Sequence, residues 1–168
     1  MNEITLRLIL VDLRGAGNVG SLLRTADACQ VELVYACGYT PYPTGAGDDR
    51  PPHVGYANAR AIGKTALGAE KTMPCTHRID PLVAIHEAKS EGFKIMVIEQ
   101  TETSLNLLSF TPKPGKYALV LGNEVSGVDT AVLEAADSIL EIPMLGSKES
   151  LGVAVAGAIA LYQLRFGH

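Results

Sequence analysis

Apolar runs alternate with amphipathic stretches along the whole chain. Apolar and β-branched runs predict strands at residues 4–11, 31–37, 93–100, 117–122 and 138–144. Apolar residues at helical spacing predict helices at 18–29, 80–92, 129–136 and 150–166, with partial helix in the alanine-rich stretch 56–70. Residues 38–55, rich in Pro, Gly and Asp, predict a surface loop. This alternation favours an α/β fold, a mostly parallel sheet with helices on both faces.

The composition agrees with one globular domain over residues 1–168. Hydrophobic residues make up 47% and charged residues 19% of the chain, which excludes a disordered protein. The net charge of −4 excludes a strongly basic nucleic-acid-coating protein, although a local basic face remains possible in the charge-balanced N-terminal half. Three cysteines, an odd number without a C-x-x-C pair, favour a reducing cytoplasm. We expect no metal site, membrane segment or signal peptide.

Residues 15–20, GAGNVG, match the dinucleotide-binding pattern G-x-G-x-x-G, between a predicted strand and a predicted helix. The pattern alone leaves two interpretations open: an NAD(P) site of the Rossmann type, or a glycine-rich turn that leads into a helix. The acidic residue expected about 20 residues later is missing, because the second strand ends in Tyr35-Ala36-Cys37-Gly38. The missing acid counts against dinucleotide binding, and on the pattern alone both interpretations stay open.

Three motifs, in order, resemble those of the SpoU/TrmH group of SPOUT RNA methyltransferases. The first is Asn18-Val19-Gly20 followed by Arg24-Thr25-Ala26-Asp27, and the second is the strand and turn LVLGNEVSGV at 119–128. The third is IPMLG at 142–146 together with SLGVAVA at 150–156. Segments 64–70 and 99–101 look similar to one subgroup of the same family. The resemblance covers most of the chain.

This resemblance implies a fold, a reaction and partners. Members of the family tie their C-terminal segment into a deep trefoil knot, bind S-adenosylmethionine (SAM) in it and act as homodimers with the active site at the subunit boundary. The implied reaction is methyl transfer to a ribose 2′-hydroxyl of tRNA or rRNA. We expect no separate RNA-binding extension, and therefore a compact tRNA substrate in preference to rRNA, recognised by the segment 38–64 with Arg50, Arg60 and Lys64.

The resemblance also assigns candidate catalytic residues, each with a simpler structural alternative. Arg24 matches the family's essential arginine; its high pKa suits stabilising an alkoxide or binding a phosphate better than acting as base, and the alternative is a salt bridge with Asp27. Asn18 belongs to the active site or caps the helix. Glu124 orients Arg24, either of the same chain or of the other subunit of the dimer, or simply lies near a helix N-terminus. Ser150 orients the substrate or caps the last helix.

The cofactor site is expected at the second and third motifs. Turns that follow buried strands expose backbone N–H and C=O groups to an adenine edge, and neighbouring apolar side chains form the walls. The candidate cofactor-binding residues are Gly122, Asn123, Ile142, Met144, Ser150 and Leu151.

The third motif departs from the family pattern. Gly152 stands where the family has an asparagine, and Ala154 replaces a hydroxyl residue. Glycine inside a helix costs about 1 kcal/mol relative to alanine. The departure leaves a second function open, a catalytically weak RNA-binding relative of the family.

Overall fold

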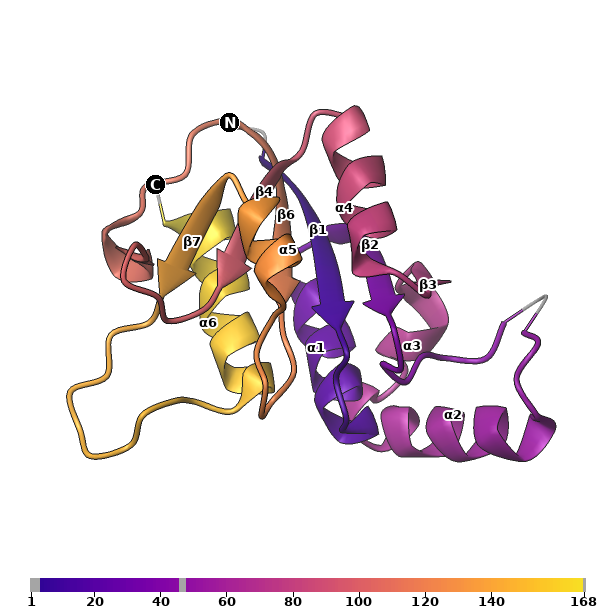
Figure 1. Cartoon of the computed structure of the whole chain (residues 1–168). Coiled ribbons are helices and arrows are strands. Elements are labelled where there is room, and N and C mark those ends of the chain that lie inside the picture. The colour runs from indigo at the N-terminus through magenta and orange to yellow at the C-terminus, as the bar shows by residue number, and fades with distance from the viewer. Residues whose placement is uncertain (1–3, 46–47, 168) are drawn as a thin grey trace.

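The computed structural model describes residues 4–45 and 48–167 and contains one seven-stranded sheet (Figure 1). The strand order is β3-β2-β1-β6-β4-β7-β5, and the strand pairs are parallel, as the sequence predicts. The elements are β1 (Ile4–Val11), α1 (Ala16–Ala28), β2 (Val31–Cys37), α2 (Pro52–Ala66), α3 (Ala69–Thr72), β3 (Cys75–Arg78), α4 (Pro81–Ser90), β4 (Lys94–Ile98), β5 (Leu105–Asn106), the 3₁₀ turn η1 (Leu107–Ser109), β6 (Gly115–Leu121), α5 (Thr130–Glu134), β7 (Ser138–Glu141) and α6 (Val153–Phe166).

Helices cover both faces of the sheet, which confirms the predicted α/β class. One buried cluster joins β1, β6 and β4 to α1, α2 and α6, and a second lies on the other face beneath α4 and α5. Both clusters are built mainly of Leu, Val, Ile and Ala, whose burial is the dominant force holding the layers together. The core therefore places the carboxyl ends of the central strands along one edge of the sheet.

Local signals decide how well each helix was predicted. Asp80 caps α4 by accepting a 2.8 Å hydrogen bond from the backbone N–H of Leu82, and Gly92 follows the helix at a φ of +87°. α1 begins at Ala16 with Gly15 as its N-cap, so the helix-cap interpretation of Asn18 is wrong. α6 begins only at Val153 with Gly152 as its N-cap, so Ser150 does not cap it either.

Two short strands and the start of one helix were missed. β3 and β5 have few apolar residues and become strands only by pairing with β2 and β7 at the two edges of the sheet. α2 begins at Pro52, inside the predicted loop 38–55, because a proline is well accommodated in a first helical turn. The predicted strand 138–144 ends at Glu141, where the chain turns toward the cavity described below.

Gly20, the last glycine of GAGNVG, is required by helix packing. A Cβ atom built there would lie 2.2 Å from Oγ1 of Thr65 and 2.3 Å from the carbonyl oxygen of Ile62, both on α2. The Thr65 hydroxyl also donates a 2.8 Å hydrogen bond to the carbonyl of Gly17. Close approach of backbones is one of the main uses of glycine. The N-terminal half of α1 and the C-terminal end of α2 are thereby held together.

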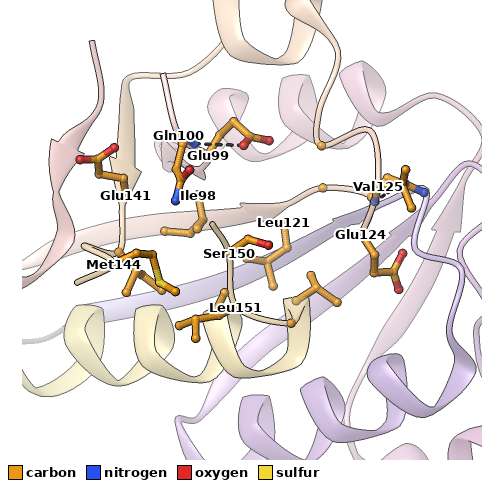
Figure 2. Close-up of a pocket in the computed structure, with 17 residues that line it drawn as sticks. Ile98, Glu99, Gln100, Leu121, Glu124, Val125, Glu141, Met144, Ser150 and Leu151 are labelled. Carbon is orange, nitrogen blue, oxygen red and sulfur yellow. Dashed lines mark hydrogen bonds between the residues drawn. The ribbon is translucent and has the colours of Figure 1, made fainter. Parts of the chain in front are cut away.

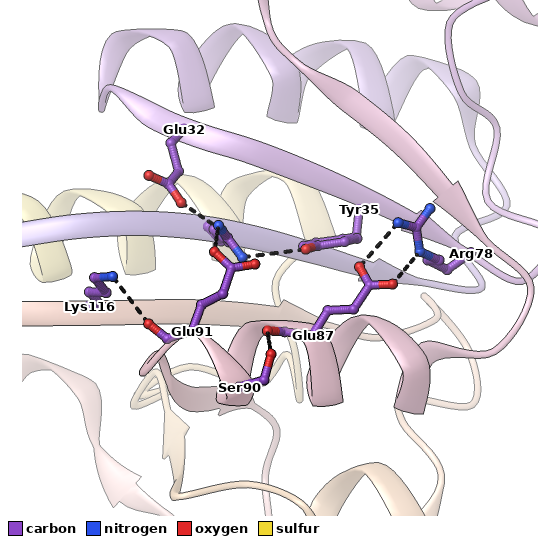
Figure 3. A network of polar contacts seen from close by, with 8 residues as sticks. Glu32, Tyr35, Arg78, Glu87, Ser90, Glu91 and Lys116 are labelled. Atoms are coloured by element: carbon purple, nitrogen blue, oxygen red, sulfur yellow. Dashed lines mark hydrogen bonds and ion pairs between the residues drawn. The ribbon is translucent and has the colours of Figure 1, made fainter.

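A polar network on the opposite face joins the sheet to α4 (Figure 3). The buried Arg7 of β1 donates to Glu32 at 2.6 Å and to Glu91 at 2.5 Å, and its guanidinium lies 4.2 Å from the centre of the Phe93 ring. The hydrogen bond from Arg7 lowers the pKa of Glu91 below its usual range. Both carboxylates remain about half exposed, so Arg7 is the only deeply buried charge of this group.

Candidate functional site

A cavity of about 370 Å³ lies at the carboxyl ends of the central strands (Figure 2). Four stretches far apart in sequence line it: 98–100 after β4, 121–127 after β6, 141–144 after β7, and 150–156 at the start of α6. They meet because β6, β4 and β7 are neighbours in the sheet, so their carboxyl ends share one edge. This edge is the usual ligand site of open parallel α/β sheets.

The structure brings the six predicted cofactor-binding residues together. Gly122 and Asn123 come from the turn after β6, Ile142 and Met144 from the segment after β7, and Ser150 and Leu151 from the approach to α6. Their apolar side chains, with those of Ile98 and Leu121, form the walls (Figure 2). The candidate catalytic residues Glu124 and Ser150 also line the cavity, whereas Arg24 and Asn18 do not.

The turn after β6 is fixed by its own hydrogen bonds. The side-chain amide of Asn123 donates to the carbonyl of Asp12 at 2.6 Å and to the Tyr39 hydroxyl at 2.8 Å, while its oxygen accepts from the N–H groups of Val125 and Ser126. A Cβ atom on Gly122 would lie 2.6 Å from the backbone of Gly127. Asn123 therefore holds the turn with its side chain, while its backbone N–H donates to the carbonyl of Gly127 at 2.9 Å and its carbonyl accepts from the N–H of Gly127 at 3.0 Å.

Glu124 joins this cavity to the start of α1. Its carboxylate accepts hydrogen bonds from the backbone N–H groups of Arg14 at 3.0 Å and Gly15 at 3.3 Å, and from the side-chain amide of Asn18 at 2.9 Å. Partial burial opposes ionisation, but these hydrogen bonds outweigh it and lower the pKa of Glu124. Of the two interpretations for Glu124, the position near a helix N-terminus is the one observed within the chain.

Arg24 lies on the exposed side of α1, outside the cavity of its own chain. In residues 4–45 and 48–167 it has no ion-pair partner, so the salt bridge with Asp27 does not form. Glu124 hydrogen-bonds Asn18 instead, so an orienting contact from Glu124 to Arg24 of the same chain is wrong. Arg24 remains available for a group outside this chain.

Two acids and one amide that line the cavity were not among the predicted site residues. Glu99, Gln100 and Glu141 line it, and the Gln100 side chain donates a 2.9 Å hydrogen bond to the backbone carbonyl of Glu149 in the loop before α6. The available signal was the position of Glu99 and Gln100 directly after the buried strand β4. With Glu124 there are three lining carboxylates, and the described lining residues include no Lys, Arg or His. The cavity therefore suits a ligand that carries positive charge.

Gly152 occupies an open position on the cavity wall. No heavy atom lies within 4 Å of a Cβ atom built there, and its backbone is extended, with φ −63° and ψ 146°. As an N-cap it lies outside the helix interior, so the expected cost of an interior glycine does not apply. The structure accepts the family's asparagine here without a clash.

Arg50 is not available to a ligand. Its guanidinium binds the Asp48 carboxylate at 2.5 and 2.8 Å, donates to the carbonyls of Tyr42 and Pro43, and lies 3.5 Å from the centre of the Tyr42 ring. Only 13% of its side chain is exposed. The expectation that Arg50 contacts RNA is therefore wrong, because this arginine holds the loop before α2 together.

The described part of the chain has no group of three or more His, Cys, Asp or Glu residues arranged to hold a metal ion. Across residues 4–45 and 48–167, the helices are too short or too polar to cross a bilayer.

The fold and the cavity define an α/β protein with a cavity of small-molecule size at the carboxyl edge of its sheet. The sequence model of the SpoU rRNA methylase family matches residues 51–162. The 23S rRNA (guanosine(2553)-2′-O)-methyltransferase RlmP of Bacillus subtilis is 35% identical over 165 residues, 95% of this chain and 58% of the relative. The chain belongs to the SpoU rRNA methylase family and spans about three fifths of this relative's length.

Solved structures agree on the fold. A TrmH/SpoU tRNA modifying enzyme from A. aeolicus superposes with a TM-score of 0.72 at 26% identity, over 98% of this chain and 75% of that one. An AdoMet-bound rRNA methyltransferase from Sinorhizobium meliloti gives 0.78 at 22% identity, over 96% of this chain and 56% of that one. The Rossmann NAD(P) interpretation of GAGNVG gains no support from these comparisons.

Proposed function

We propose that this chain transfers a methyl group from SAM to a ribose 2′-hydroxyl of RNA. The observation that carries the proposal is the convergence of the second and third motifs on one cavity. Six residues chosen from the sequence as cofactor contacts line the same space at the carboxyl edge of the sheet. Family membership supports the same reaction class, as do relatives named for their action on rRNA or tRNA.

The residues of the cavity fit this cofactor. A volume of about 370 Å³ lies within the range of small-molecule sites. The walls formed by Leu121, Ile142, Met144 and Leu151 suit an adenine ring, and exposed backbone groups in the turns suit its polar edge. The three carboxylates favour a ligand with an ammonium and a sulfonium group. We propose that these residues hold SAM, within the trefoil knot implied by the family resemblance.

SAM supplies an electrophilic methyl group on a positively charged sulfur. The methyl group would pass from this sulfur to O2′, and the hydroxyl proton would leave to a base or to water. The protein must therefore align the hydroxyl and stabilise the negative charge that develops on its oxygen. In this proposal Ser150, which lies on the cavity wall, orients the hydroxyl, and an arginine is suited to the developing charge because it stays protonated.

We propose that this arginine is Arg24 of a second copy of the chain. Arg24 is exposed and outside its own cavity, so a homodimer would supply it across the subunit boundary. The preference for tRNA over rRNA stays a prediction, as do the single domain over 1–168 and the cytoplasmic location. Cysteine usage supports that location: Cys37 and Cys75 are unpaired, and burial raises the pKa of each thiol to about 12, which makes the thiols unreactive.

Two measurements test the proposal. Isothermal titration calorimetry should detect binding of S-adenosylhomocysteine, and no heat at millimolar ligand would refute the cofactor assignment. Mass mapping of ribose methylation should show one methyl group lost in a deletion strain and restored by the wild-type gene. Restoration by Arg24→Ala would contradict the role of this arginine.

A further inference from the structure

α2 has two distinct faces. Gly55, Ile62 and Ala66 are buried, and the last two lie against α1 where it passes Gly20. The opposite face carries His53, Tyr56, Arg60 and Lys64, at intervals of three and four residues, and all four are exposed. Residues at this spacing lie above one another on one side of a helix. We call these four residues the α2 face.

The charge of the α2 face is not compensated within the chain. α2 contains no Asp or Glu, and within residues 4–45 and 48–167 neither Arg60 nor Lys64 has an ion-pair partner. The nearby Arg50 behaves differently, since its carboxylate partner Asp48 holds it in place. Tyr56 is 74% exposed and adds a large aromatic ring to the same side. Free cations beside an exposed aromatic ring are typical of single-stranded nucleic-acid sites.

The α2 face ends close to the candidate active site. The C-terminal end of α2 is held to α1 by the hydrogen bond from Thr65 to Gly17. The start of α1 in turn binds Glu124, which lines the cavity. Figure 1 shows α2 extending outward from the carboxyl edge of the sheet, with its C-terminal end beside the start of α1. A strand lying along α2 would therefore be led toward the cavity.

We propose that the α2 face binds an unpaired stretch of the RNA substrate. Tyr56 stacks on one base, and Arg60 and Lys64 contact successive phosphates. The helical rise places Tyr56 and Lys64 roughly 12 Å apart along the axis, about the length of two extended nucleotides. An unpaired strand fits better than a duplex, because a base that stacks on Tyr56 must first leave the stack of an RNA double helix. The inference rests on the proposed function, since it names the form of RNA that the enzyme holds.

The test uses the full chain and a labelled twelve-nucleotide oligoadenylate, with a twelve-base-pair RNA duplex for comparison. Fluorescence anisotropy is measured from 0.05 to 0.5 M salt for the wild type, Arg60→Gln/Lys64→Gln, Tyr56→Ala and Tyr56→Phe. The matched control is Lys89→Gln/Lys94→Gln, which removes the same charge from two exposed lysines, one in the last turn of α4 and one at the first residue of β4.

The two kinds of variant should differ in their salt dependence. Loss of two phosphate contacts lowers the slope of log affinity against log salt by about 1.4 and weakens binding about 20-fold at 0.1 M. Tyr56→Ala weakens oligoadenylate binding about 5- to 150-fold at an unchanged slope, and Tyr56→Phe restores it. The wild type should bind the duplex more weakly than the single strand.

Three results would overturn the inference: a wild type that does not bind oligoadenylate, variants that bind like the wild type, or a control that weakens binding equally. Calorimetry with S-adenosylhomocysteine on the same proteins separates this inference from the proposed function. If the variants bind both S-adenosylhomocysteine and RNA like the wild type, the role of the α2 face in RNA binding is refuted and the methyltransferase proposal stands. RNA binding that depends on the α2 face in a protein that takes no cofactor refutes the methyltransferase proposal instead.

Discussion

Replacing Gly152 by asparagine should stabilise the protein, and replacing it by alanine should destabilise it. Gly152 is the N-cap of α6, and its extended backbone and open surroundings accept either side chain. No side chain caps this helix at present. An asparagine side chain can accept a hydrogen bond from the second or third N–H group of the helix, whereas alanine offers no acceptor.

The magnitudes follow from N-cap energetics. At an N-cap, asparagine stabilises a helix by a few tenths of a kcal/mol more than glycine does, and by about 1 kcal/mol more than alanine does. For a chain of this size, 1 kcal/mol corresponds to about 2–4 °C in Tm. We therefore expect Gly152→Asn to melt about 1 °C above the wild type and Gly152→Ala about 2 °C below it.

Differential scanning calorimetry at fixed pH and protein concentration measures both shifts. An asparagine variant that melts at or below the alanine variant would show that residue 152 does not act as an N-cap. The same two proteins test the alternative of a catalytically weak relative. A methylation rate raised by asparagine but not by alanine would show that the missing amide limits catalysis.

Two further predictions concern packing and charge. Gly20→Ala should lower the free energy of unfolding by about 3 kcal/mol, because the new methyl group meets Thr65. Gly17→Ala in the same helix should not destabilise the protein, because no atom lies closer than 3.9 Å to the new methyl group. Urea unfolding measures both variants, and equal effects would contradict the packing argument. Arg7→Met should cost about 2 kcal/mol at pH 7. Because Arg7 lowers the pKa of Glu91 in the folded protein, the Arg7–Glu91 pair stabilises the fold fully above the ordinary pKa of 4.5, and this contribution is lost as the pH falls through the lowered pKa. Urea unfolding at pH 7 and pH 4 should therefore show that the variant loses less free energy of unfolding on acidification than the wild type.

The sequence predicted elements whose character is set by their own residues. The apolar runs at 4–11 and 31–37 are strands with the predicted bounds, and Asp80 caps its helix as expected. β3 and β5 could not be found because their strand character comes from pairing with a neighbour. The order of the strands was equally out of reach, since it depends on contacts between segments far apart in the chain.

The sequence indicated which residues line the candidate cavity better than it indicated which contacts their side chains make. The six proposed cofactor contacts line one cavity at the carboxyl edge of the sheet, and their role as cofactor contacts stays a prediction. The sequence could not tell that the side chain of Asn123 is taken up by the turn, or that Asn18 binds Glu124. Arg50 was misassigned because a sequence does not reveal which cations fold back onto a neighbouring carboxylate. The position of Glu99 and Gln100 at the end of a predicted strand was visible in the sequence, but that β4 lies between β6 and β7, beside the other lining segments, was not.

The hydrogen bond between Tyr39 and Asn123 ties a surface residue to the geometry of the candidate site. The Tyr39 ring is 62% exposed and lies outside the cavity, yet its hydroxyl holds the amide that fixes the turn after β6. In a mutational screen scored on cofactor affinity, Tyr39→Phe would therefore register beside substitutions of the cavity wall. A library designed only from residues within reach of the ligand would leave out this position, and with it a means of tuning affinity that leaves the contact surface intact.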